Sequence, residues 1–351
     1  MKTTHTIFFD DSKDMGEIKS NSIDLLITSP PYPMIEMWDE LFSSKDDRIG
    51  LALKNEKGKL AYDLMHENLS EVWEECVRVV KESGIICINI GDATRKIGKT
   101  FQLFPNHVKV SQFFQDNGSI PLPMILWRKP TNSPTKFMGS GMLPSNAYVT
   151  LEHEYILLFR NGLKNRKFPP NSETRYNSAF FWEERNRWFS DIWKDMRGVS
   201  QTLQNNGDLR ERSAAFPLEL PYRLINMFSV YGDTVLDPFW GTGTTTLAAM
   251  ILARNSIGFE LDSEFISIFE ENIKKIKMIN ETFNKKRIKS HIRSVENYSK
   301  RNHIKYTSIN YRFPVITSQE QNILFYSIQD IISDEHNYSL IHKPYELGDM
   351  E

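Results

Sequence analysis

Cysteine is scarce and long apolar runs are missing from this chain of 351 residues. The two cysteines, Cys76 and Cys87, do not support a disulfide framework or a cysteine zinc site. No run approaches the roughly 20 apolar residues of a membrane-spanning helix, and residues 1–9 lack the long apolar segment of a signal peptide. These absences exclude membrane-spanning and disulfide-rich secreted classes. We expect a cytoplasmic protein with no membrane partner.

An excess of charge of one sign is also missing. The chain has 43 Lys and Arg against 45 Asp and Glu, a formal net charge of −2. This balance excludes a globally basic coat for nucleic acid, so any such contact must come from a local patch. The length and the 40% of hydrophobic residues allow a large buried core, in one large or two modest domains. Glu152, His153 and Glu154 would alternate between the faces of a strand, so we expect no metal site.

The first motif is a proline loop that follows an apolar run at residues 22–27. The run predicts a buried strand, which the loop Thr28-Ser29-Pro30-Pro31-Tyr32 stops abruptly. Open α/β sheets bind ligands at the carboxyl ends of their strands. The proline carbonyls and the Ser29 hydroxyl could accept hydrogen bonds there, and the Tyr32 ring offers a flat face to a base. A plain proline-rich turn, or a ligand for a small peptide-binding domain, is the alternative interpretation.

The second motif lies roughly 200 residues later and predicts a strand, a glycine turn and a helix. Residues 233–237 form the expected strand, and Gly241 and Gly243 allow close approach of a ligand before a helix over 244–253. The next expected strand, 256–262, carries Glu260 near its end, where nucleotide-binding folds place the acid that binds ribose hydroxyls. A dinucleotide fold would need a third glycine, and that position is Thr246.

Together the two motifs resemble the amino-methylating DNA methyltransferases that use S-adenosylmethionine. The proline loop precedes the glycine loop, an order that resembles the circularly permuted β group of that family. The resemblance implies a doubly wound α/β, Rossmann-like methyltransferase sheet with permuted halves and an inserted target-recognition region. It also implies S-adenosyl-L-methionine as cofactor and double-stranded DNA as partner in a prokaryotic cytoplasm. A cognate restriction endonuclease that acts on the same site is a further candidate partner.

The resemblance assigns roles to residues of both loops. Ser29 and Pro30 would accept the two amine hydrogens, Pro31 would stiffen the loop, and Tyr32 would stack on a base flipped out of the duplex. The cofactor-binding residues it implies are Asp11, Thr28, Asp237, Pro238, Phe239, Trp240, Gly241, Gly243, Thr244, Thr245, Glu260 and Leu261. A solvated acid at the end of a strand remains the alternative interpretation of Asp11.

Residues 161–213 change in character, because basic and aromatic residues are interleaved there. Such a mixture suits phosphate and base contacts, and the β group places its target-recognition region at this position. The predicted DNA contacts are Lys129, Lys136, Arg166, Lys167, Arg175, Arg185 and Arg187. An aromatic subdomain core with a charged shell is the alternative. The expected organisation is a catalytic half (1–160), the recognition region (161–213), the cofactor half (214–280) and an extension of unknown role (281–351).

Periodicity predicts the remaining elements. Strands are expected at 6–9, 85–90, 124–129 and 154–160, and helices at 66–82, 104–117 and 263–280. Residues 214–225 resemble the family's helix before the glycine loop. The charged, glycine-punctuated stretch 42–60 predicts a mobile surface loop that could close over DNA. Asp92 is expected to cap a helix.

The residue before Pro-Pro-Tyr bears on the target base. Within the family, serine there is commoner among enzymes that methylate cytosine N4, whereas aspartate or asparagine usually accompanies adenine N6. We therefore favour a site-specific cytosine-N4 DNA methyltransferase, with adenine N6 as the alternative. A non-catalytic, sequence-specific DNA-binding protein with a methyltransferase fold and a nicotinamide oxidoreductase are interpretations from other classes.

Overall fold

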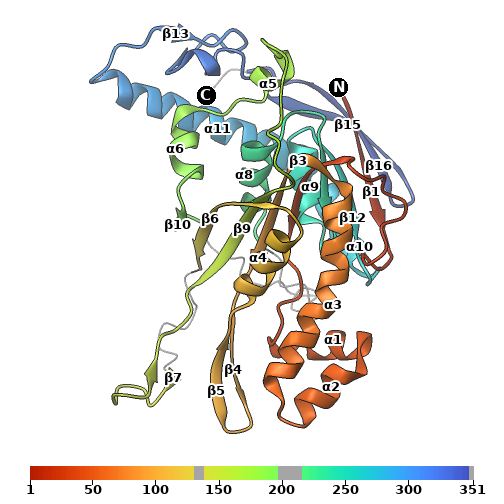
Figure 1. The fold of residues 1–351 in the computed structure, drawn as a ribbon. Helices are drawn as coiled ribbons and strands as arrows, with labels where there is room; N and C mark the ends of the chain where they lie inside the picture. Colours follow the sequence, from red (N-terminus) through yellow and green to blue (C-terminus); the bar gives the residue numbers. More distant parts are fainter. Residues whose placement is uncertain (130–137, 197–215, 348–351) are drawn as a thin grey trace.

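A mixed β-sheet forms the centre of the computed structural model, which describes residues 1–129, 138–196 and 216–347 (Figure 1). Within these ranges the strand order is β10-β6-β9-β3-β2-β11-β12-β1-β16-β15. The strands are β1 (Lys2–Phe8), β2 (Ile23–Thr28), β3 (Val80–Ile90), β6 (Ile120–Arg128), β9 (His153–Arg160), β10 (Ile192–Trp193), β11 (Thr234–Asp237), β12 (Asn255–Phe259), β15 (Tyr326–Asp334) and β16 (Asn337–Pro344). The central five, from β3 to β1, are parallel. The predicted α/β class is therefore confirmed.

Helices cover both faces of the sheet. One face carries α3 (Gly58–Val79) and α4 (Asn106–Asp116), and the other carries α8 (Glu219–Phe228), α9 (Thr244–Ile251), α10 (Phe265–Ile273) and α11 (Ile276–Ser299). Along β2, Leu26 packs in the same cluster as Trp73 of α3, whereas Leu25 and Ile27 pack in the cluster of α8 and α9. Both faces of β2 are buried, which explains its mostly apolar sequence, interrupted by Asp24.

Short elements extend beyond the carboxyl ends of the parallel strands (Figure 1). They are η1 (Glu36–Trp38), α1 (Asp39–Lys45), α2 (Asp47–Lys54), the hairpin of β4 (Ala93–Ile97) with β5 (Thr100–Phe104), and the hairpin of β7 (Met138–Gly139) with β8 (Ala147–Tyr148). The rings of Phe101 and Tyr148 stack at 4.9 Å and so join the two hairpins. Asp92, just before β4, accepts from the backbone N–H of His107 in the first turn of α4.

The prediction of a mobile loop at 42–60 is wrong. This stretch forms α1, α2 and the first turn of α3, and it buries Phe42, Ile49 and Ala52. Asp46 separates the two short helices and accepts a 2.9 Å hydrogen bond from the Arg48 N–H at the start of α2. The apolar spacing is broken at this cap, and each helix alone is too short for a clear periodic signal.

The segment after residue 280 completes the sheet. The predicted helix 263–280 is instead two helices, and α11 continues to Ser299. Its inward positions include Asn280, Asn284 and Arg287, and the Asn280 amide donates to the backbone oxygens of Ile251 and Tyr326. Buried polar residues at these positions conceal the helical period. The β15–β16 hairpin then pairs antiparallel with β1, and the sequence contains no recognisable motif for this pairing.

Residues 161–196 contribute a small aromatic and ionic subdomain core. It contains α5 (Glu173–Asn177) and α6 (Trp182–Trp188), and Phe181 before α6 packs with residues of α11 and β14 (Pro314–Val315), the strand that pairs with β13 (Tyr306–Thr307). Glu320 of η2 (Ser318–Glu320) accepts from the Trp182 N–H, whereas β10 joins the central sheet beside β6. Phe181 is fully buried in this small core, Trp188 and Trp193 are fully buried in the main core, and the buried Arg287 pairs with Glu184 at 2.6 Å. Much of the aromatic signal in this region therefore comes from packing.

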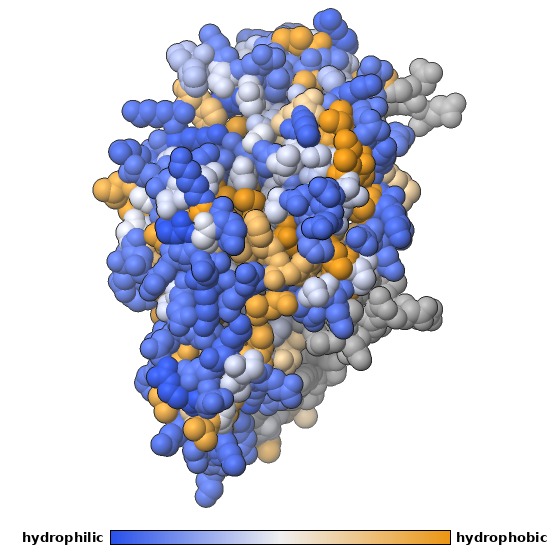
Figure 2. Space-filling model, turned by 90° about the vertical axis from the view of Figure 1, so that its right-hand side faces the viewer, coloured by the Kyte–Doolittle hydropathy of each residue, from blue (hydrophilic) through white to orange (hydrophobic). Residues whose placement is uncertain are grey.

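Hydrophilic residues dominate the face of the molecule drawn in Figure 2, and hydrophobic residues lie in its middle and in smaller scattered patches. Within the described ranges, no helix is both long and apolar enough to cross a membrane.

Candidate active site

A buried carboxylate connects the two loops. Asp237 ends β11, and its two oxygens accept hydrogen bonds from the Thr28 hydroxyl at 2.7 Å and the Thr245 hydroxyl at 2.6 Å. The Phe239 N–H also donates to it, at 3.2 Å. Burial raises the pKa of Asp237 to about 6, and these hydrogen bonds oppose the rise. The proline loop and the glycine loop are thus held together at one edge of the sheet.

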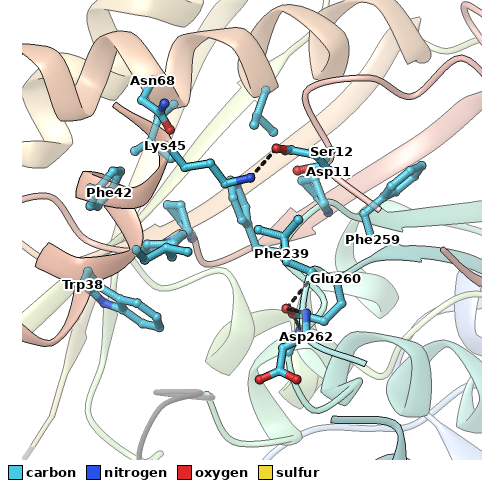
Figure 3. Close-up of a pocket in the computed structure, with 18 of the residues that line it drawn as sticks. Asp11, Ser12, Trp38, Phe42, Lys45, Asn68, Phe239, Phe259, Glu260 and Asp262 are labelled. Atoms are coloured by element: carbon cyan, nitrogen blue, oxygen red, sulfur yellow. Dashed lines mark hydrogen bonds and ion pairs between the residues drawn. The ribbon is translucent and has the colours of Figure 1, made fainter. Parts of the chain in front are cut away.

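A cavity of about 370 Å³ opens between the two loops and α1 (Figure 3). This volume lies in the range of roughly 300–1,000 Å³ that is typical of small-molecule sites. Aromatic side chains make much of its wall, and acidic groups lie at its ends. The residues that line it include Asp11, Ser29, Pro30, Pro31, Tyr32, Trp38, Phe42, Lys45, Pro238, Phe239, Gly241, Phe259, Glu260 and Leu261.

The two glycines of the turn have different roles. Gly241 has φ of +53°, and an added Cβ would meet no atom nearer than the Phe239 carbonyl oxygen at 4.0 Å. Gly243 has φ of +74°, and a Cβ there would lie 2.4 Å from Phe269 and 2.6 Å from Trp240. Gly241 therefore leaves room in the cavity, whereas Gly243 allows core side chains to pack against the turn.

Glu260 is fixed at the cavity wall by backbone donors. One oxygen accepts from the Gly241 N–H at 2.8 Å, and the other accepts from Leu261 N–H at 2.8 Å and Asp262 N–H at 3.0 Å. Burial raises the pKa of Glu260, and the same hydrogen bonds oppose that rise. A carboxylate held in one orientation at this strand end matches the position that binds ribose hydroxyls in nucleotide-binding folds.

Helix α1 closes the opposite side of the cavity. Lys45 reaches across to Asp11, with 2.5 Å between Nζ and Oδ2 (Figure 3). Trp38 and Phe42 supply apolar surface from the same segment, facing Phe239 and residues of the glycine-loop half. Sequence reasoning missed Phe42 and Lys45 because it assigned no helix to this stretch.

A polar network lies beside the proline loop. The Tyr32 hydroxyl donates to Glu154 at 3.0 Å and lies 3.1 Å from the Ser29 hydroxyl. The Asn89 amide donates to the Tyr32 oxygen at 2.8 Å and to Glu154 at 2.7 Å, and Lys129 pairs with the other Glu154 oxygen. Burial, and then the Glu154 charge, raise the pKa of Tyr32 well above its usual range. Nothing in the sequence indicates a role for Asn89, and Glu154 entered only as a rejected metal ligand.

The structure brings half of the predicted cofactor residues to the cavity. Those that line it are Asp11, Pro238, Phe239, Gly241, Glu260 and Leu261, and those that do not are Thr28, Asp237, Trp240, Gly243, Thr244 and Thr245. Trp240 is 2% exposed, and its indole N–H donates to Thr246 in the core. A Cβ at Gly258 would lie 2.2 Å from Trp240, so this tryptophan needs a glycine beside it. The four predicted catalytic residues all line the cavity.

The predicted DNA contacts are dispersed. Arg166 pairs with Asp233 at 2.5 Å, just before β11 begins and so at the opposite end of the sheet from Ser29. The guanidinium groups of Arg166 and Arg175 lie 4.7 and 4.9 Å from the centre of the Phe168 ring. Three others also lie in the 161–196 segment: Lys167 is exposed, Arg185 lies over Phe189, and Arg187 lies near Asp195. Lys136 falls outside the described residues.

One cluster of possible metal ligands occurs in the described ranges, namely Glu183, His291 and Glu320. Each already has a protein partner. His291 Nδ1 lies 3.1 Å from Glu183 and its Nε2 lies 3.1 Å from the Pro314 carbonyl oxygen, while Glu320 accepts from the Trp182 N–H at 2.7 Å. The cluster ties α6 to α11 and η2.

The fold and the cavity define a class. A parallel sheet with a glycine turn, a fixed acid at the next strand and a cavity at the carboxyl ends is typical of proteins that bind a nucleoside-containing cofactor. The proline loop adds hydrogen-bond acceptors at the mouth of that cavity. This arrangement is that of a methyltransferase that acts on an amine.

Comparison with known proteins identifies the family. The profile of a DNA methylase family, the N6 and N4 methyltransferases, matches residues 23–271. The Type II methyltransferase M.MthZI of Methanothermobacter thermautotrophicus is 54% identical over 93% of this chain and 91% of its own length. M.MjaI of Methanocaldococcus jannaschii, also a Type II methyltransferase, is 53% identical over 77% of this chain and 91% of its own length.

Solved structures agree. A protein from Thermus thermophilus, described as a putative DNA modification methylase and complexed with S-adenosyl-L-methionine, is 28% identical with a TM-score of 0.60, over 78% of this chain and 94% of that one. The PvuII DNA methyltransferase shares the fold at 19% identity and a TM-score of 0.53, over 78% of this chain and 91% of that one.

The chain therefore belongs to the amino-methylating DNA methylase family. It is a DNA methyltransferase of the restriction–modification type, and its cofactor is S-adenosylmethionine. The interpretation as a nicotinamide oxidoreductase is wrong.

Proposed function

We propose that the chain methylates the N4 amine of cytosine at a specific DNA sequence. The observation that carries this proposal is the pair of neutral acceptors at the cavity, the Ser29 hydroxyl and the Pro30 carbonyl. Pro30 is buried, and no donor within the described ranges reaches its carbonyl oxygen. A serine at this position is also the commoner choice in relatives that modify cytosine N4. Adenine N6 is the alternative target.

Two acceptors explain how an exocyclic amine can react. Its lone pair is delocalised into the base ring, which makes it a poor nucleophile. When Ser29 and Pro30 accept its two hydrogens, the lone pair is directed out of the ring plane. The remaining catalytic contribution is positioning and electrostatics. Because a duplex hides this direction of attack, the base must leave the stack, and the Tyr32 ring would lie against it.

We assign the cofactor to the cavity between Glu260 and Asp11. Glu260 would accept from the ribose hydroxyls, the aromatic wall of Phe239 and Phe259 would hold the adenine ring, and Gly241 would leave room for the remainder. When bound, the cofactor supplies an electrophilic methyl group. Asp11 would meet a polar edge of the adenine, which requires its ion pair with Lys45 to rearrange.

We infer that DNA lies against the elements beyond the carboxyl ends of the strands. The β4–β5 hairpin carries the exposed Lys96 and Lys99, which can neutralise phosphates. The β7–β8 hairpin exposes Met142 and Leu143 by 86% and 69%, in a protein whose other large apolar groups are mostly buried. Apolar side chains of this kind are used to fill or wedge apart base steps. Both hairpins are on the side of the sheet where Ser29 lies.

The direct test uses unmethylated DNA and isotopically labelled S-adenosylmethionine, followed by enzymatic digestion and nucleoside mass spectrometry. We expect labelled N4-methylcytosine. Labelled N6-methyladenine would overturn the cytosine assignment but not the family. Stable DNA binding without any labelled base would favour the non-catalytic alternative.

A partner follows from the same activity. We propose that a restriction endonuclease with the same recognition site accompanies this chain, since its relatives are named Type II methyltransferases. Mapping of the methylated site by sequencing, followed by cleavage assays with endonucleases of that specificity, tests this. Methylated DNA should resist cleavage, and unchanged cleavage would contradict the pairing.

A further inference from the structure

The polar network beside Ser29 has a defined direction. Glu154 is a carboxylate paired with Lys129, so it can only accept, and the Tyr32 hydroxyl donates its single proton to it at 3.0 Å. The Asn89 amide also donates to the Tyr32 oxygen. Tyr32 therefore has no proton left for Ser29, and across their 3.1 Å contact the serine must be the donor.

This direction leaves the Ser29 oxygen as an acceptor toward the cavity. Its proton points to Tyr32, and its lone pairs are free for an incoming N–H. The contact from the Asn89 amide to Ser29 is 3.5 Å, too long to compete for those lone pairs. The raised pKa of Tyr32 keeps its hydroxyl protonated at neutral pH, so the chain of donors stays intact.

We propose that Ser29, Tyr32 and Glu154 form a proton relay that accepts the proton released when the amine is methylated. The inference rests on the proposed role of Ser29. As the N–CH₃ bond forms and the S–CH₃ bond breaks, the bond's electron pair stays on sulfur and the amine nitrogen becomes positively charged. Its N–H bond then breaks and the electron pair returns to nitrogen.

The proton moves in three linked steps. The amine proton passes to Ser29 Oγ, the serine proton passes to the Tyr32 oxygen, and the tyrosine proton passes to Glu154, which ends as a neutral carboxylic acid. Ser29 and Tyr32 end neutral, as they began, and Glu154 later loses the proton to solvent. Its side chain is 13% exposed and Lys129 is 37% exposed, which gives that proton a route out.

Asn89 and Lys129 act as positioning residues. Asn89 donates to both the Tyr32 oxygen and Glu154 Oε2, which fixes their relative orientation. Lys129 pairs with the other oxygen of Glu154 and so fixes the orientation of that carboxylate. Its predicted role as a DNA contact stays a prediction beside this pairing with Glu154.

Tyr32→Phe separates the relay from simple stacking. Phenylalanine keeps the ring face but removes the hydroxyl link. Stacking alone predicts near-normal methyl transfer by this variant, whereas the relay predicts a single-turnover rate lowered roughly 10²-fold, the lower end of general base catalysis. A Tyr32→Phe enzyme with the wild-type rate would overturn the relay.

Glu154→Gln tests the terminal acceptor, with Glu152→Gln as the matched control. Glu152 is two positions away, 43% exposed, and paired with Arg128 on the surface. We expect Glu154→Gln to lower the single-turnover rate roughly 10²-fold, with Glu152→Gln unchanged. A Glu154→Gln enzyme with the wild-type rate would contradict the proposal.

Two further readouts isolate the effect. Calorimetry should show unchanged S-adenosylmethionine affinity in Tyr32→Phe and Glu154→Gln, and thermal unfolding should show that both fold. The solvent deuterium isotope effect should decrease in both variants because the coupled protons no longer move. A full rate in Ser29→Ala would instead overturn the proposed function, so the two failures are distinguishable.

Discussion

The Thr28 hydroxyl donates a 2.7 Å hydrogen bond to Asp237, although the two residues lie 209 positions apart. Thr28 ends β2 and leads into the proline loop, and Asp237 ends β11 and leads into the glycine loop. Asp237 is 2% exposed, so this contact is fully sheltered from water. The relative position of the amine pocket and the cofactor cavity therefore depends on one buried carboxyl group.

Asp237 should give the protein a measurable pH dependence. Its pKa is about 6 in the folded state against 3.8 for an ordinary aspartate, so the unfolded chain loses this proton first. Between about pH 4 and pH 6 the free energy of unfolding contributed by this group falls as the pH rises, by on the order of 2–3 kcal/mol, and then stays constant. Asp237→Asn removes this pH-dependent contribution to the free energy of unfolding.

Chemical denaturation of wild type and Asp237→Asn at pH 4.5 and pH 7.5 checks the sign. The stability of the variant relative to wild type should be more favourable at pH 7.5 than at pH 4.5. An identical difference at both pH values would show that Asp237 ionises normally in the folded protein.

Gly241→Ala and Gly243→Ala should fail in different ways. Gly243→Ala forces a Cβ into Trp240 and Phe269 at a positive φ, and we expect it to destabilise the fold by about 2–4 kcal/mol. Gly241→Ala meets no clash, so it should cost only about 1–2 kcal/mol from its φ but reduce cofactor affinity by projecting into the cavity. Denaturation curves measure the loss of stability, and calorimetry measures the loss of cofactor affinity. If Gly241→Ala lost mainly stability and Gly243→Ala mainly affinity, the roles assigned to the two glycines would be exchanged.

Glu260→Gln should weaken the cofactor by roughly 1–3 kcal/mol, because a charge-assisted hydrogen bond to the ribose is replaced by a neutral one. Glu264→Gln is the matched control, since Glu264 is exposed, four residues further on, and outside the cavity. Calorimetric titration with S-adenosylmethionine distinguishes them. Equal affinities for both variants would remove Glu260 from the cofactor site.

Arg166→Met and Lys96→Met should separate stability from DNA binding. Arg166 pairs with Asp233 at the far end of the sheet, so its loss should lower stability by about 1 kcal/mol or less with little change in DNA affinity. Lys96 is exposed on the β4–β5 hairpin, and its loss should reduce the slope of log affinity against log salt by about 1. DNA affinity measured at several salt concentrations distinguishes the two variants. If only Arg166→Met changed the salt slope, Arg166 and not Lys96 would be the phosphate contact.

The sequence predicts the sheet and the two loops well because their signals are local. Residues 22–27 are apolar for most of their length, and prolines or glycines mark the point where each motif strand ends. It does not predict Glu154 as a partner of Tyr32, since the two are 122 positions apart and meet only when β9 pairs with β3. The sequence also suggests a cofactor contact for Trp240 because of its position in the glycine loop, but this side chain packs in the core behind the turn.

The segment predicted as the recognition region shows the limit of composition as evidence. Arginines beside aromatic residues suit DNA, yet they equally suit packing of a guanidinium group over a ring, as Arg166 does on Phe168. The two arrangements have the same residue content. Only the position of the arginines relative to the edge of the sheet that carries Ser29 distinguishes DNA contact from packing.

The pairing of β1 with β16 has a consequence for synthesis on the ribosome. β1 contains residues 2–8, and its antiparallel neighbour begins at Asn337, so the ribosome makes the two strands far apart in time. Until that hairpin is made, one side of β1 presents unpaired backbone groups, a template for pairing with other chains. Nascent chains stalled before residue 337 should therefore depend on chaperones or aggregate, and release of residues 326–344 closes the edge.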